Sequence, residues 1–253
     1  MNKNKVDIMV SLIGLSASFL SYAGTMGVVE APTRNLYLTA SANYNMFDVN
    51  RATTTSITND SISALASSMQ NRWGYGGGIG FIYCDQLRFD FITQARPNIH
   101  YSVTDTVPET ARGTVDITSY MFNAYYTLPT LAYFNLSPFN LSPYFTVGIG
   151  PSMTSTSQIF WPDASVNQLE GGHRIINFAW QVGAGVSYAL TDYLDLDFNY
   201  EFFGLNKFAN NGFFTQLAPE GDSAAGQAAP TTFRRLYDNQ LQIGVRYKFN
   251  GPY

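Results

Sequence analysis

The sequence predicts an all-β fold: an eight-stranded antiparallel transmembrane β-barrel with up-and-down topology. Segments of alternating polarity recur from residue 35 to the end, and a period of two marks a strand whose two faces meet different surroundings. Short and long connections alternate between these segments, as expected when a barrel crosses a membrane with short turns on one side and long loops on the other. Charged residues are only 13% of the 253 residues and aromatic residues reach 15%. Amphipathic rings favour a membrane–water boundary.

Residues 1–23 have the character of a cleavable signal peptide. Lys3 and Lys5 give a positive start, an apolar stretch follows over 8–20, and the small residues Ser21 and Ala23 suit a cleavage site. The apolar stretch is too short to cross a membrane as a helix, and a buried N-terminal helix is the alternative. The expected parts of the chain are a signal peptide at 1–23, a lead-in at 24–34, the barrel at 35–249 and a C-terminal tail at 250–253.

Eight segments carry the alternation. The sixth is the clearest, because Ile176, Phe178 and Trp180 share one face while Asn177 and Gln181 share the other. Such a segment fits a strand with one face toward lipid and the other toward a polar interior. The expected strands are 35–47, 73–83, 87–96, 115–128, 144–153, 176–188, 194–202 and 240–249.

The connections alternate in length. Short turns are expected at 84–86 and 191–193. Between the fourth and fifth strands the sequence FNLSP occurs twice in tandem, over 134–143, and makes that connection longer than the pattern expects. With both ends of the barrel on one side of the membrane, the four long loops fall together on the other side. These loops are expected at 48–72, 97–114, 154–173 and 204–232.

Each predicted strand has an apolar face and a face that carries polar and charged residues. The charges show which of the two faces the interior. A charge at the lipid midplane costs about 2–4 kcal/mol on a barrel surface, and an eight-stranded barrel is only wide enough inside for side chains. We therefore expect a polar interior, with a soluble β-sandwich as the main alternative fold. Because buried charges must be paired, we expect an ion-pair network that plugs or gates the lumen, or that is merely structural. Its six members near the short turns are Arg88, Asp90, Asp195, Asp197, Arg246 and Lys248.

The last strand carries a more specific pattern. The segment QIGVRYKF over 242–249 resembles the β-signal that the barrel assembly machinery recognises, with Gln242, Gly244, Tyr247 and Phe249 at its marked positions. Together with the strand pattern, the chain from about residue 33 resembles the small OmpA, OmpX and opacity-protein barrels of Gram-negative outer membranes. The resemblance implies an outer-membrane location, surface exposure, loop-borne adhesion or immune contact, and at most a narrow pore. One departure is that four residues follow Phe249.

The expected partners are outer-membrane lipid and lipopolysaccharide, the barrel assembly machinery, and a host or cell-surface partner that contacts the outer loops. The net charge of -4 offers no basic surplus for nucleic acid. His100 and His173 fall in different loops without a second ligand at metal-binding spacing, so no metal or cofactor is expected. The single cysteine, Cys84, cannot form an internal disulfide.

The leading function is therefore a non-enzymatic surface barrel with structural, adhesive or host-contact roles. A narrow ion-conducting pore is the first alternative, because charges line the expected lumen. A lipid-active enzyme at the outer rim is the second, with His100, Ser102 and Asp105 as the residues that could be arranged for catalysis.

Overall fold

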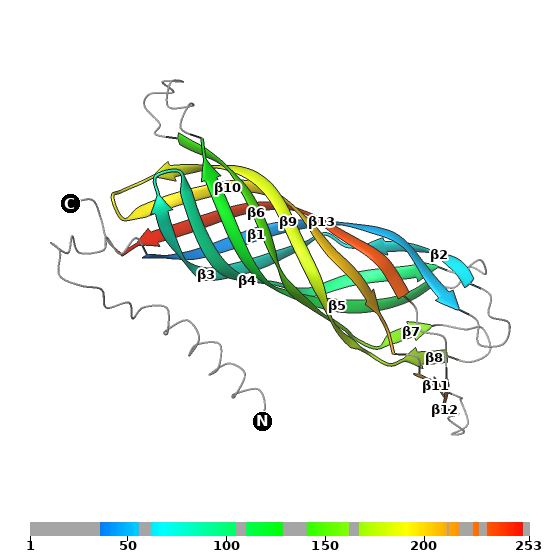
Figure 1. Cartoon of the computed structure of the whole chain (residues 1–253). Coiled ribbons are helices and arrows are strands. Elements are labelled where there is room, and N and C mark those ends of the chain that lie inside the picture. Colours follow the sequence, from blue (N-terminus) through cyan, green and yellow to red (C-terminus); the bar gives the residue numbers. More distant parts are fainter. Residues whose placement is uncertain are drawn as a thin grey trace, which may run out of the picture. The chain divides into compact units, whose positions relative to one another are not determined.

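The computed structural model describes residues 36–55, 62–104, 110–128, 141–161, 167–211, 213–217, 225–227 and 232–249. Within these ranges the chain forms strands and no helix (Figure 1). No helix among these residues is long and apolar enough to cross a membrane. The signal peptide, lead-in and tail expected at 1–23, 24–34 and 250–253 lie outside the described residues and stay predictions.

Eight long strands close into an antiparallel barrel, which confirms the predicted fold. Each of them pairs with the next along the chain, and the last pairs with the first over almost its full length. The eight strands are β1 (Leu36–Thr55), β3 (Arg72–Cys84), β4 (Leu87–Thr104), β5 (Thr110–Thr127), β6 (Leu141–Thr156), β9 (Arg174–Ala189), β10 (Leu194–Ala209) and β13 (Thr232–Lys248).

Five short strands extend the sheet at one end of the barrel. In Figure 1 they gather at the end opposite the tight turns that join β3 to β4 and β9 to β10. One of them pairs with both β1 and β4, and the other four form a chain of pairings that starts from β5. They are β2 (Ile62–Met69), β7 (Ile159–Trp161), β8 (Asn167–Glu170), β11 (Phe213–Leu217) and β12 (Ala225–Gln227).

The long strands reach much further than the sequence pattern predicted. β1 has 20 residues, about twice what a tilted strand needs to cross a membrane. The loops expected at 48–72 and 97–114 are therefore wrong over much of their length, because β1, β2, β4 and β5 continue through them. Ladder pairing satisfies the backbone N–H and C=O groups beyond the lipid as well as within it. β6 likewise begins inside the second FNLSP copy, where Pro143 lies opposite Val186.

A broad apolar belt covers the outside of the barrel on the side of the tight turns. The belt includes Trp73 and Tyr83, which are 63% and 71% exposed. Aromatic side chains lie at both of its edges, with Tyr193 and Tyr247 near the turns and Trp73 and Trp180 further out. Such a surface is unfavourable in water and matches the apolar band and aromatic girdles of a membrane barrel.

The interior has two parts of opposite polarity. Inside the belt it is lined by buried Arg, Asp, Glu, Asn and Gln side chains, as the sequence predicted. Beyond the belt it is filled by apolar side chains, so the expectation of a polar interior was wrong for the outer part. We call this second part the outer core; its members are Ile99, Tyr101, Val103, Ala111, Val115, Ile117, Met121, Ile159, Ala179, Phe203, Leu205, Phe208, Phe233 and Leu236.

Candidate functional site

The candidate site is the lumen, which begins at the tight-turn end with a cluster of ion pairs. Arg246 Nη2 lies 2.8 Å from Asp195 Oδ2 and 3.7 Å from Asp197 Oδ1. Lys248 Nζ lies 3.0 Å from Asp195 Oδ1, and Arg88 Nη2 lies 3.5 Å from Asp197 Oδ1. Strand register places these groups together, since Arg246 and Asp195 are direct partners on β13 and β10. We call these five residues the mouth network.

Asp90, the sixth predicted member, belongs to a different layer. Among the described residues it forms no ion pair within 4.0 Å. Its carboxylate instead accepts hydrogen bonds from Asn123 Nδ2 at 2.9 Å, Tyr37 Oη at 3.1 Å and Tyr125 Oη at 3.3 Å. The structure thus brings five of the six predicted residues together and places Asp90 among neutral donors.

Tyrosine rings complete the lower part of the lumen. The Arg88 guanidinium carbon lies 4.3 Å from the ring centroid of Tyr125 and 4.5 Å from that of Tyr144. Cation–π contacts of this kind hold a desolvated guanidinium in place. The cavity beside Tyr37, Arg88 and Asp90 measures about 10 Å³, which is room for about one water molecule.

A further carboxylate lies deeper, and amides surround it. Glu201 accepts hydrogen bonds from Asn199 Nδ2 at 2.9 Å, Gln240 Nε2 at 3.2 Å and Gln181 Nε2 at 3.4 Å. Glu201 itself is 1% exposed. Amide donors from β9, β10 and β13 therefore satisfy the Glu201 carboxylate. This carboxylate forms no ion pair with another described residue.

The top of the polar lumen is closed by a buried ion pair that the sequence reasoning missed. Arg96 Nε lies 2.7 Å from Asp238 Oδ2, and both side chains are fully buried. The Arg96 guanidinium also lies 4.5 Å from the ring centroid of Phe203, at the base of the outer core. We call the pair and its four partners the seal. The four partners accept hydrogen bonds from Arg96 at 2.9 to 3.2 Å: Asn45, Gln94, Ser119 and Gln240.

One feature of the sequence, the alternation of polar residues before residue 240, could have been used to predict the seal. The polar face of the last strand continues backwards from Arg246 through Gln242 and Gln240 to Asp238 with a period of two. The expected last strand began at 240, which left Asp238 outside both that strand and the loop expected at 204–232. Arg96 ends the strand expected at 87–96, so the expected strands include only one of the two partners.

Above the seal the outer core fills the barrel. Phe208 and Phe233 stack with ring centroids 4.1 Å apart, and Tyr101 meets both rings edge-on. Each member of the outer core is at most 3% exposed. An aqueous path through the described barrel would have to part both the seal and this apolar packing. The described lumen is therefore a closed structure.

Three of the four residues that resemble the β-signal, Gln242, Gly244 and Tyr247, lie on β13, which closes the barrel against β1, and Phe249 directly follows that strand. Gln242 and Gly244 face the lumen, and Gln242 Oε1 accepts a hydrogen bond from Gln240 Nε2 at 2.9 Å. Tyr247 and Phe249 are exposed on the outside, and their ring centroids are 5.6 Å apart. Their part in assembly stays a prediction.

Of the three residues of the rim-enzyme alternative, His100 and Ser102 line one hollow on the outer surface. His100 and Ser102 lie on the outside of β4, and Ser102 Oγ is hydrogen-bonded to Ser68 Oγ at 2.7 Å. Asp105 lies outside the described residues. Within those residues, no group of three or more His, Cys, Asp or Glu side chains could hold a metal ion.

Comparison with known proteins gives relatives of the same kind. The family model described as outer membrane protein beta-barrel domain matches residues 8–249. An uncharacterized protein of Brucella abortus is 28% identical over 209 residues, which cover 72% of this chain and 70% of the relative. Outer membrane protein PagN of Salmonella typhimurium is 27% identical over 146 residues, covering 57% of this chain and 55% of the relative.

A solved structure has a similar fold. The outer membrane protein OprG from Pseudomonas aeruginosa superposes with a TM-score of 0.50 at 10% identity, over 87% of this chain and 98% of that chain. An identity this low speaks for the fold alone. Because the family model covers nearly all of the sequence, the chain belongs to the outer membrane protein β-barrel domain family.

Proposed function

We propose that this protein is a surface barrel that acts through its outer end, in a structural, adhesive or host-contact role, and that its lumen is closed to ions. The observation that carries the proposal is the closed lumen. Two barriers of different chemistry lie in series, the charged seal and the apolar outer core. A pore would need an aqueous path where the described barrel has buried side chains.

The outer end supports the contact role. β1 and β4 have 20 and 18 residues, so their outer halves extend beyond the lipid as a continuous sheet. The outer core stiffens this part from inside, and the pairings of β7, β8, β11 and β12 add a further sheet to it (Figure 1). Rigid elements hold a binding surface more exactly than free loops do.

Two measurements test the proposal. Refolded protein in a planar bilayer should give no steady ion-selective steps. Cells that display the protein should lose attachment to cultured animal cells when residues 213–227 are replaced by a short Gly-Ser linker. Replacement of residues 129–135, between β5 and β6, serves as the control, because β5 ends beside the tight turn that joins β3 to β4. Steady conductance, or attachment that is equal in the two variants, would contradict the proposal.

A further inference from the structure

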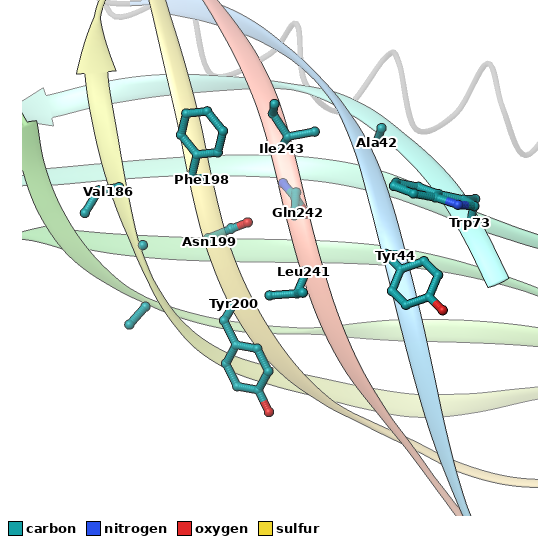
Figure 2. A pocket seen from close by; sticks show the side chains of 12 residues that line it. Ala42, Tyr44, Trp73, Val186, Phe198, Asn199, Tyr200, Leu241, Gln242 and Ile243 are labelled. Carbon is teal, nitrogen blue, oxygen red and sulfur yellow. The ribbon is translucent and has the colours of Figure 1, made fainter. Parts of the chain in front are cut away.

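The wall of the barrel that faces lipid is hollowed at one place. The hollow has a volume of about 840 Å³ and crosses β9, β10, β13 and β1, with Trp73 of β3 at its edge (Figure 2). Ala42 and Ala184 carry only a methyl group, so they form a low floor among the larger side chains around them. We call this hollow the groove.

Strand register arranges the lining in two rows. The first row runs Ala42, Ile243, Phe198, Val186 and the second runs Tyr44, Leu241, Tyr200, Ala184, each across β1, β13, β10 and β9. Figure 2 shows the hydroxyl ends of Tyr44 and Tyr200 at the same side of the lining, beyond Leu241. The groove is therefore apolar along its floor and has polar tips at one end.

The depth of the groove in the membrane follows from β1. Leu36 begins the apolar face at the tight-turn end, and Ala42 lies six residues further along. At about 3.3 Å per residue and a tilt near 40°, this is about 15 Å of an apolar band about 25 Å tall. Both rows thus lie in the outer half of the band, with the tyrosine hydroxyls toward the outer surface. The lipid that covers them belongs to the outer leaflet.

Two cationic side chains stand above the groove on the strands that form its centre. Arg235 lies six residues beyond Leu241 on β13, and Lys207 lies on β10 between Asn206 and Phe208, which pair with Leu236 and Phe233. Both cations are exposed. Neither forms an ion pair with another described residue. Cations next to a membrane surface attract anionic lipid groups.

From these observations we propose that the groove and the pair Lys207–Arg235 form a binding site for one lipopolysaccharide molecule. One acyl chain lies over Ala42 at the β1 side of the groove and another over Ala184 at the β9 side, each beside aromatic side chains. A phosphate of the head group meets Lys207 and Arg235. The apolar floor and the two unpaired cations lie on the same strands, and an amphiphile with acyl chains and phosphates in the outer leaflet matches both. The site is independent of the closed lumen and of any partner at the outer end.

The test measures the lipopolysaccharide that stays with the protein. The full chain is assembled in the outer membrane of a Gram-negative host and extracted in mild detergent, and lipopolysaccharide and phospholipid per barrel are measured by mass spectrometry. One variant fills the groove, Ala42→Phe with Ala184→Phe. A second removes the cations, Lys207→Gln with Arg235→Gln. The controls make single changes of the same two kinds elsewhere on the wall, Ala124→Phe and Arg112→Gln, both on β5.

Each cation lost should weaken binding of the anionic head group about fivefold, so the second variant should retain about 25-fold less lipopolysaccharide. The filled groove should also lose most of it, and both controls should retain it. Shift of the folded band on unboiled gels shows that each variant has assembled. Retention unchanged in the two test variants overturns the site. So does loss of phospholipid instead of lipopolysaccharide, or a cross-linked dimer that only the filled groove abolishes, since a second copy of the chain would then cover this face.

Discussion

Removing the charge of Asp238 should destabilise the barrel strongly. Asp238→Asn keeps the shape of the side chain but leaves Arg96 as an unpaired charge in a fully buried position. Breaking a buried ion pair from one side costs about 3–5 kcal/mol. Arg96→Met should cost more, about 5 kcal/mol or above, because the carboxylate and the four acceptors that Arg96 serves all lose their donor.

The double variant measures how strongly the two charges depend on each other. With Arg96→Met already present, Asp238→Asn removes the stranded carboxylate charge and should restore about 1–3 kcal/mol, so the two effects are not additive. Asp48→Asn on the exposed face of β1 is the control and should change stability by about 0.5 kcal/mol or less.

The assay is equilibrium unfolding by guanidinium of each variant refolded into phospholipid vesicles, followed by tryptophan fluorescence. A cost below about 1 kcal/mol for Asp238→Asn, or strict additivity in the double variant, would refute the claim that the two charges depend on each other. Conductance gives a second readout. The variants should stay silent in a planar bilayer, because the outer core lies above the seal and is unchanged.

Three further predictions concern the mouth network, the lumen glycines and the last strand. Asp195→Asn leaves Arg246 and Lys248 without their nearest carboxylate and should cost about 3 kcal/mol in vesicle unfolding, and an unchanged midpoint would mean that these pairs are solvated. Gly78→Ala should block folding, because its Cβ would clash with the Phe91 backbone carbonyl oxygen, whereas Gly244→Ala meets nothing closer than 3.4 Å and should refold normally in vitro. Tyr247→Ala with Phe249→Ala should slow assembly in cells, measured by pulse–chase, while unfolding in vesicles changes little. Equal losses in both assays would make these rings structural instead of an assembly signal.

Period-two reasoning located the membrane-crossing part of the barrel because lipid on one side and a polar lumen on the other impose opposite polarities on neighbouring residues. It placed Arg88, Asp195, Asp197, Arg246 and Lys248 on the inward face, where the structure has them. Pairing between strands far apart in sequence was out of reach, because register between β10 and β13 depends on contacts along their whole length. Asp90 illustrates this, since its neighbours Tyr37 and Asn123 come from two other strands.

The part of the barrel that encloses the outer core was not predicted, for a different reason. Strand β4 illustrates this reason. Up to Arg96 its even-numbered residues face inward, but Ile99, Tyr101 and Val103 face inward beyond it. A bulge between Arg96 and Ile99, with Asn98 at a φ of 52°, shifts the alternation by one residue. A pattern that continued in phase would have put His100 and Ser102 inside. Because the sequence does not reveal the bulge, the alternation was predicted to end at Arg96 and the segment from residue 97 was predicted to be a polar loop.

The bulge lies where the outer surface of the barrel passes from lipid to water. Where lipid surrounds the wall, apolar side chains face out and polar ones face in; where water surrounds it, the same sheet must do the reverse. β4 meets this requirement by the shift at Asn98, while β1 keeps its phase and changes residue type, from Asn43 and Asn45 to Phe47 and Val49 on the inward face. Arg96 stands at the boundary, with Asp238 on one side and the Phe203 ring on the other. The seal is thus the place where the two polarities meet, and a membrane barrel below it joins a barrel of soluble character above.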